Sequence, residues 1–217
     1  QSETFSIRAA GRLATTATPG HIPQILAAAS QDSMVPAVRA AIVRATGKRL
    51  DESALNSWLA FIETTAAALS GADDAKKQSL YPVLEAATDA LSARTGHATD
   101  LPSEWKGWVD RARRLDGFRF GRTYFVCTAS NEGAVELAVK LPEQPTDTGV
   151  SIVLNRYNPK EDRWESRPAS IAPGQAVGDG PYATGLTYVG ARPDPALAGQ
   201  VYEFKDAQGN TRTFHAR

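Results

Sequence analysis

The residues that could carry nucleophilic or metal chemistry are few and lie far apart in the sequence. The chain has one cysteine, Cys127, and three histidines, His21, His97 and His215. No two of these residues occur at the short spacings that place two ligands on one metal ion, so the sequence predicts neither a metal site nor a bound cofactor. Cys127 alternates with Phe125 and lacks a neighbouring base that would activate it, so we expect a buried, structural thiol.

The sequence contains residue types that could form a hydrolytic site, but no motif supports such a site. Ser130 or Ser170 with His215 and a carboxylate would make a triad, but no Gly-x-Ser-x-Gly turn accompanies them. The loop 178–181 has neither the lysine nor the following helix of a phosphate-binding loop. Two facing carboxylates suffice for glycoside hydrolysis, and most of those available fall on predicted turns or solvated strand faces. They are Glu132, Glu136, Glu161, Asp162, Glu165 and Glu203. The sequence therefore names no catalytic residue and leaves enzymatic activity uncertain.

Aromatic and arginine side chains gather around one predicted hairpin and a later loop. Trp, Tyr and Arg contribute a large share of the binding energy in protein interfaces, and indole rings also stack on sugars. The sequence thus predicts a recognition edge, with the alternative that Trp164 packs in the core. The candidate binding residues are Arg156, Tyr157, Arg163, Trp164, Arg167 and Tyr182.

Charge excludes several classes of partner. The 24 basic and 24 acidic residues of the 217-residue chain cancel, and residues 1–116 hold 13 of each. Nucleic acids and anionic membrane surfaces both require a basic excess, so we expect neither as a partner. Apolar runs are far shorter than the roughly 20 residues that span a bilayer, and we therefore expect no membrane insertion.

The elements that must position these residues change character near Gly117. From Arg119 onward the apolar period is two, and Val, Thr, Tyr and Phe replace the alanine-rich helical runs. In the run 134–141, Leu137 and Val139 face one way and Glu136 and Lys140 face a solvated side. The predicted strands are 120–129, 134–141, 150–157, 163–171, 184–191, 200–205 and 211–215, which favour an antiparallel β-sandwich over a small barrel.

The preceding half predicts a small bundle of about five helices. Apolar residues recur at helical spacing around 22–29, over 34–46, from Leu55 to Leu69, from Leu80 to Leu91 and from Trp105 to Leu115. Asp32 or Ser33 could cap the second helix, and Asp51 could cap the third. Pro82 requires that the fourth helix start near Ser79 or kink.

We therefore predict an α+β protein in three parts. They are an N-terminal strand and linker (1–19, with Phe5 and Ile7 on one side), a helical domain (20–116) and an all-β domain (117–217) packed rigidly on it. The start at Gln1 and the alanine and arginine usage favour an exported bacterial protein, periplasmic or secreted, with the cytoplasm as the alternative.

Function follows from this largely by elimination. The leading hypothesis is a non-enzymatic binding protein that recognises a protein or glycan through loops of the β domain. The alternatives are a hydrolase with a carboxylate-based site at the groove between the two halves, and a structural subunit of a secretion or phage-like assembly.

Overall fold

The computed structural model describes residues 8–9, 12, 16–99, 101–130, 133–146, 148–194 and 199–216, with the backbone alone at 129, 130 and 133. Two compact units are present. The first comprises Gln1–Ala93 and Ala98–Val109, and the second comprises Arg94–His97 and Asp110–Arg217. The predicted strand of Phe5 and Ile7 lies outside the described residues, and rigid packing of the two predicted domains remains a prediction.

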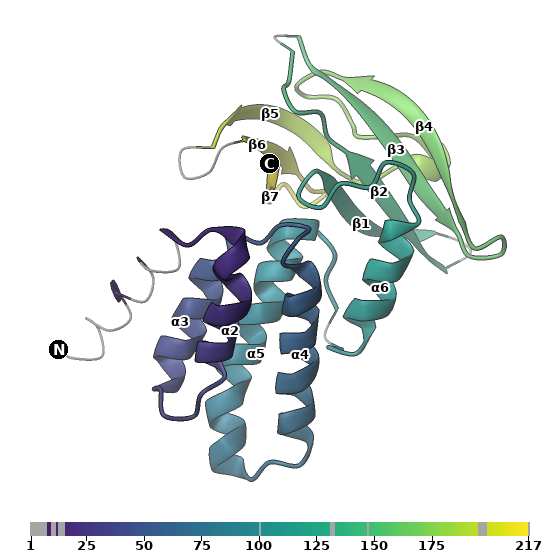
Figure 1. Cartoon of the computed structure of the whole chain (residues 1–217). Coiled ribbons are helices and arrows are strands. Elements are labelled where there is room, and N and C mark those ends of the chain that lie inside the picture. The colour runs from purple at the N-terminus through teal and green to yellow at the C-terminus, as the bar shows by residue number, and fades with distance from the viewer. Residues whose placement is uncertain are drawn as a thin grey trace. The chain divides into compact units, whose positions relative to one another are not determined.

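The described part of the chain has five α-helices and two antiparallel sheets, which confirms the coarse α+β prediction (Figure 1). After a 3₁₀ turn, η1 (Pro19–His21), the helices begin and end close to the predicted positions, except that α5 begins earlier. They are α2 (Ile22–Ala29), α3 (Pro36–Gly47), α4 (Leu55–Ser70), α5 (Asp74–Thr95) and α6 (Glu104–Arg113).

The helical unit is built around the apolar stripe of α4. Leu55, Trp58 and Ile62 have no exposed surface, and the Trp58 indole nitrogen donates to the carbonyl oxygen of Ala87 on α5 at 3.0 Å. Helices α3 and α5 approach so closely at Gly47 that an added Cβ would lie 2.3 Å from the Cβ of Ala90. The periodicity of α4 therefore predicted its buried face correctly, because helical spacing alone determines which side chains share a face.

Two expectations about helix starts are wrong, a start near Ser79 for the fourth helix and a side-chain cap for the second. Helix α5 begins at Asp74 and continues through Pro82, so of the two alternatives for this helix the kink stays a prediction. Its first turn is stabilised by Asp73, whose Oδ1 accepts a hydrogen bond from the Lys76 amide at 2.8 Å. Helix α3 has Val35 at its N-cap position and no side-chain cap. Asp32 instead accepts hydrogen bonds from Lys76 and from Arg39.

All seven predicted strands are present, and two of them have the predicted bounds. One sheet has the order β1-β2-β3-β4 and the other the order β5-β6-β7. The loop between β4 and β5 contains a 3₁₀ turn, η2 (Gly180–Tyr182). The strands are β1 (Thr123–Ser130), β2 (Gly133–Lys140), β3 (Val150–Asn158), β4 (Arg163–Ile171), β5 (Thr187–Pro193), β6 (Gln200–Lys205) and β7 (Thr211–Ala216).

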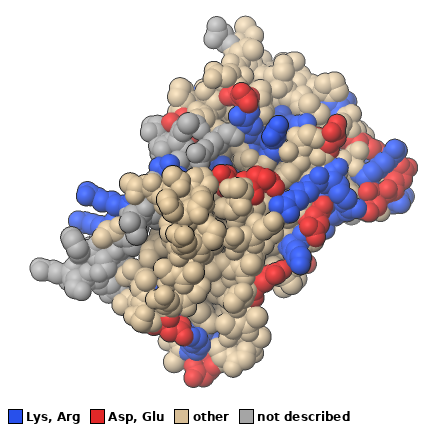
Figure 2. Space-filling view, in the orientation of Figure 1, with Lys and Arg blue, Asp and Glu red and all other residues tan. Residues whose placement is uncertain are grey.

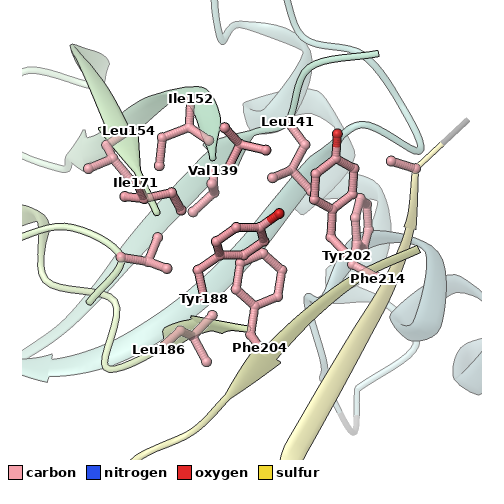
Figure 3. Packing of buried hydrophobic residues seen from close by; sticks show 13 residues of the cluster. Val139, Leu141, Ile152, Leu154, Ile171, Leu186, Tyr188, Tyr202, Phe204 and Phe214 are labelled. Carbon is pink, nitrogen blue, oxygen red and sulfur yellow. The ribbon is translucent and has the colours of Figure 1, made fainter. Parts of the chain in front are cut away.

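One apolar cluster joins the two sheets. Val139 and Leu154 of the four-stranded sheet contribute to it together with Tyr188, Phe204 and other residues of the three-stranded sheet (Figure 3). We call the side of the four-stranded sheet that carries Val139 and Leu154 the cluster face, and its opposite side the outer face. Because side chains alternate along a strand, the register of the sheet assigns every residue of β1–β4 to one of these faces.

Candidate functional site

The β3–β4 hairpin carries five of the six predicted binding residues, but on different faces. Tyr157 pairs with Trp164 in the register and lies on the outer face, whereas Arg156 and Arg167 lie on the cluster face beyond the apolar residues. Arg163 pairs with Asn158 and shares the face of Arg156. The predicted recognition edge is therefore two separate groups of residues.

The outer-face residues, Tyr157 and Trp164, pack against other side chains of the same unit. The Trp164 indole is half-buried, with its ring centroid 5.3 Å from that of Tyr157 and 6.0 Å from that of Phe125. Its nitrogen donates to the carbonyl oxygen of Arg111, in the last turn of α6, at 3.0 Å. The guanidinium carbon of Arg111 lies 6.0 Å from the centre of the Tyr157 ring. Trp164 thus fixes the end of α6 against the sheet, which argues against an indole free for ligand binding.

The hairpin tip has an unusual backbone conformation at a residue whose carboxylate accepts two hydrogen bonds. Among the described residues, Asp162 is the one non-glycine residue with a positive φ, 49°. Its carboxylate accepts hydrogen bonds from Arg114 and from the Tyr157 hydroxyl. The bond from Arg114, together with that from Tyr157, lowers the pKa of Asp162 below its usual value, and the same carboxylate raises the pKa of both donors. We call Arg114, Tyr157 and Asp162 the tip clamp.

The cluster-face group forms a small platform next to η2. The Arg167 guanidinium carbon lies 4.9 Å from the centre of the Tyr182 ring, and its Nη2 is 2.8 Å from Asp179 Oδ1. Stacking of an arginine on an aromatic ring while it pairs with a carboxylate fixes both side chains at the surface. We call Arg167, Asp179 and Tyr182 the Arg–Tyr platform. The sequence indicated Arg167 and Tyr182 but gave no sign that Asp179 would join them.

The other cluster-face residues pair with acids. Arg163 Nε lies 2.5 Å from Glu161 Oε2, and its side chain is 64% exposed. Arg156 Nη1 lies 3.9 Å from Glu165 Oε2, and Asn158 donates to the other oxygen of Glu165 at 2.9 Å. On the face in Figure 2, basic and acidic side chains likewise lie next to one another. The hairpin surface is therefore of mixed charge.

The prediction of a buried thiol is wrong, because Cys127 is exposed. It does share the outer face with Phe125, as the alternation predicted, but β1 is an edge strand, and Cys127 pairs with Glu136 in the register. The prediction of a solvated Glu136 is also wrong. Its side chain is only 14% exposed, 3.5 Å from His97 Nδ1 and 3.8 Å from Arg111 Nη2.

The histidines do not complete the hypothetical triad. His215 Nδ1 lies 2.7 Å from Oδ2 of Asp194, a carboxylate that is 4% exposed. Alternation places His215 on the side of β7 opposite the apolar cluster, whereas Ser170 lies on the outer face of the other sheet. Because the apolar cluster lies between these two faces, Ser170 cannot reach the imidazole. The Ser130 side chain lies outside the described residues.

The candidate carboxylates that the structure describes lie beside basic side chains rather than beside one another. Glu161, Asp162, Glu165 and Glu203 each lie within 4 Å of an arginine nitrogen. A glycosidase needs one carboxyl group with a raised pKa, whereas the pKa of Asp162 is lowered. Glu132 lies outside the described residues.

A shallow groove of about 580 Å³ lies on the four-stranded sheet, at the end away from the hairpin tip. Its floor combines Lys140, Ser151, Val153, Pro168 and Ser170 of the outer face with their strand neighbours, and Lys140 is held by a 3.0 Å hydrogen bond to the carbonyl oxygen of Asp116. Within the described residues, no group of three His, Cys, Asp or Glu side chains is arranged to hold a metal ion. The groove thus offers hydroxyls and one amine without an acid–base or metal centre.

Comparison with known proteins gives no relative: no protein-family model, curated protein or solved structure matches this chain significantly. Over the residues that are described, no helix has both the length and the apolar content needed to span a membrane. The functional argument therefore rests on the geometry of the hairpin and its neighbours.

Proposed function

We propose that this chain is a binding protein whose β unit recognises a protein partner through the Arg–Tyr platform and the adjacent exposed Arg163. In this proposal the two sheets are the layers of a β-sandwich, and β4 with the η2 loop forms its recognition edge. Export to the periplasm or the cell exterior is part of the same proposal, and cell fractionation of the source organism tests it.

The observation that supports this proposal is the arrangement of Arg167, Asp179 and Tyr182. Binding usually costs side-chain entropy, because long side chains must be ordered at the interface. Here the guanidinium is already oriented between a ring at 4.9 Å and a carboxylate at 2.8 Å. Arginine and tyrosine are also the residue types enriched among energetic centres of protein interfaces.

Mixed charge favours a protein partner over a glycan. Arg163 and Arg167 lie on the same face of β4, about 13 Å apart at 3.3 Å per residue. Each has an acid beside it, Glu161 and Asp179 respectively. A protein surface can complement alternating signs, whereas stacking on a sugar requires an open aromatic face. One side of the Tyr182 ring is covered by Arg167, and Trp164 packs against Phe125 and Tyr157.

The test compares three forms of the chain in affinity purification from the source organism, followed by titration of each specific partner in purified form. We expect Arg167→Ala to weaken binding at least about tenfold, because truncation of an energetic centre costs that much or more. The matched control is Arg44→Ala, which removes a half-exposed arginine of the helical unit that lies 3.9 Å from Glu85.

Three results would contradict the proposal. Equal affinity of the wild type and Arg167→Ala for a partner would show that the interface does not include Arg167. Loss of binding with Arg44→Ala as well would indicate a non-specific charge effect. Binding on a glycan array that is abolished by Arg167→Ala and Tyr182→Ala would replace the protein partner with a sugar.

A further inference from the structure

We propose that the tip clamp is a pre-organising device: Arg114 and Tyr157 hold Asp162 in its left-handed conformation and thereby fix the direction in which Arg163 enters β4. This inference deepens the proposed function, on which its biological meaning rests. The clamp itself is a property of the chain alone and can be measured without a partner.

The backbone of Asp162 requires an explanation. A residue with a Cβ at a φ of 49° is in a sparsely populated region, although Asp and Asn tolerate it better than other residue types do. Such a conformation persists only when surrounding contacts over-determine it. Both carboxylate oxygens of Asp162 are engaged, one by Arg114 and the other by the Tyr157 hydroxyl.

The two donors are themselves fixed from different parts of the unit. Tyr157 contacts the Trp164 ring, and the Trp164 indole nitrogen donates to the main chain of Arg111, three residues before Arg114. Arg111 also lies over the ring of Tyr157. These contacts therefore connect the end of α6, the sheet and the turn to one another. A turn held in this way keeps its conformation before a partner arrives, which lowers the entropy cost of binding.

Nuclear magnetic resonance of the isolated full-length chain tests the clamp directly. We expect Arg114→Met to accelerate hydrogen exchange of the Lys160 amide, which donates to Asn158 Oδ1 within the turn, by about three- to fivefold, in the range of an exposed charged pair. The backbone order parameter of Asp162 should fall from about 0.85 toward 0.6. Lys160→Met removes one positive charge from the same tip without touching Asp162. It should leave unchanged the order parameter of Asp162 and the protection of the residue-160 amide, once the exchange rate is corrected for the intrinsic rate of the new side chain.

Two further variants separate positioning from a general loss of structure. Asp162→Asn keeps a side chain that tolerates positive φ and one acceptor oxygen, so it should give exchange between the wild type and Arg114→Met. In the double variant Arg114→Met/Asp162→Asn the Lys160 amide should exchange no faster than in Arg114→Met, because both substitutions remove the same contact between Arg114 and Asp162. Unchanged exchange in Arg114→Met, or strictly additive effects, would overturn the clamp. That outcome would leave the Arg–Tyr platform untouched, since the platform is tested by partner affinity at Arg167.

Discussion

Arg39 offers the sharpest test of how the helical unit is stabilised. Its side chain is 2% exposed, and Nε donates to the carbonyl oxygen of Ala29, the last residue of α2, at 2.7 Å. Its Nη1 lies 3.3 Å from Ser79 Oγ and 3.5 Å from Asp32 Oδ1. One guanidinium thus joins the end of α2 to α5 and to the turn before α3. Arg39→Met retains an apolar stem of similar length and removes all of these donors.

The expected loss of stability combines opposing contributions. A hydrogen bond from a charged donor to a buried carbonyl contributes about 1.5–3 kcal/mol, and the Ala29 oxygen would lose it. Removing a buried guanidinium also removes its desolvation penalty, which offsets roughly 1 kcal/mol. Asp32 adds little to the loss, because its side chain is 65% exposed and it keeps its contact with Lys76. We therefore expect Arg39→Met to lower the free energy of unfolding by about 1–2 kcal/mol.

Urea denaturation followed by circular dichroism at 222 nm measures this change. With a slope of about 1–2 kcal/mol per molar for a unit of this size, the unfolding midpoint of the helices should fall by about 1 M. Arg44 lies on the same helix, and its side chain is 53% exposed. The control variant Arg44→Met should therefore shift the midpoint by less than about 0.2 M. Equal midpoints for Arg39→Met and the wild type would refute the reasoning that this buried guanidinium stabilises the unit.

Three further predictions follow from packing, polar burial and proton linkage. Gly47→Ala should destabilise the helical unit by about 1–3 kcal/mol in urea titrations, because the added methyl group would overlap Ala90. In the control Gly107→Ala, in α6, the methyl group meets no atom within 4 Å, and this variant should raise the free energy of unfolding by up to about 1 kcal/mol. Asn155→Leu should cost about 2–3 kcal/mol of unfolding free energy, because Asn155 is 1% exposed and its amide donates to two main-chain carbonyls; a loss below about 0.5 kcal/mol would contradict this. Burial raises the pKa of Tyr202 from 10.0 to about 12, so on raising the pH the unfolded state loses this proton before the folded state does. The contribution of the protonated Tyr202 to the free energy of unfolding is therefore complete below pH 10 and should be lost between pH 10 and 12. Denaturation midpoints across that range should decline less steeply for Tyr202→Phe than for the wild type.

Much of the local structure could be predicted because it depends on short-range chemistry. Strand β4 begins at Arg163 and ends at Ile171, as the alternation predicted, and α4 buries the stripe that includes Trp58. Glycine at 96, with a φ of 77°, follows the last residue of α5, as expected of a residue that tolerates the left-handed region. These features require only side-chain periodicity and backbone preference.

The helix starts were less predictable because distant side chains compete for the same groups. Asp32 was a reasonable cap for α3 by sequence, yet its carboxylate pairs with Lys76, 44 positions later. Pro82 indicated either a start near Ser79 or a kink, whereas Asp73 stabilises a start at Asp74. In both cases the deciding partner lies outside the local window that propensity describes.

The arrangement of the candidate site was decided by the tertiary structure. The sequence by itself identified Tyr157, Trp164 and Arg167 as residues suited to recognition, because residue type determines what a side chain can contact. Only the register of β3 with β4 assigned Tyr157 to the outer face and Arg167 to the cluster face. Only the contacts of Arg111, in the last turn of α6, with Trp164 and Tyr157 brought Arg114 to the turn. Arg114 precedes Asp162, to which it donates, by 48 positions. Contacts between residues so far apart depend on how the elements pack together, which local sequence patterns do not encode.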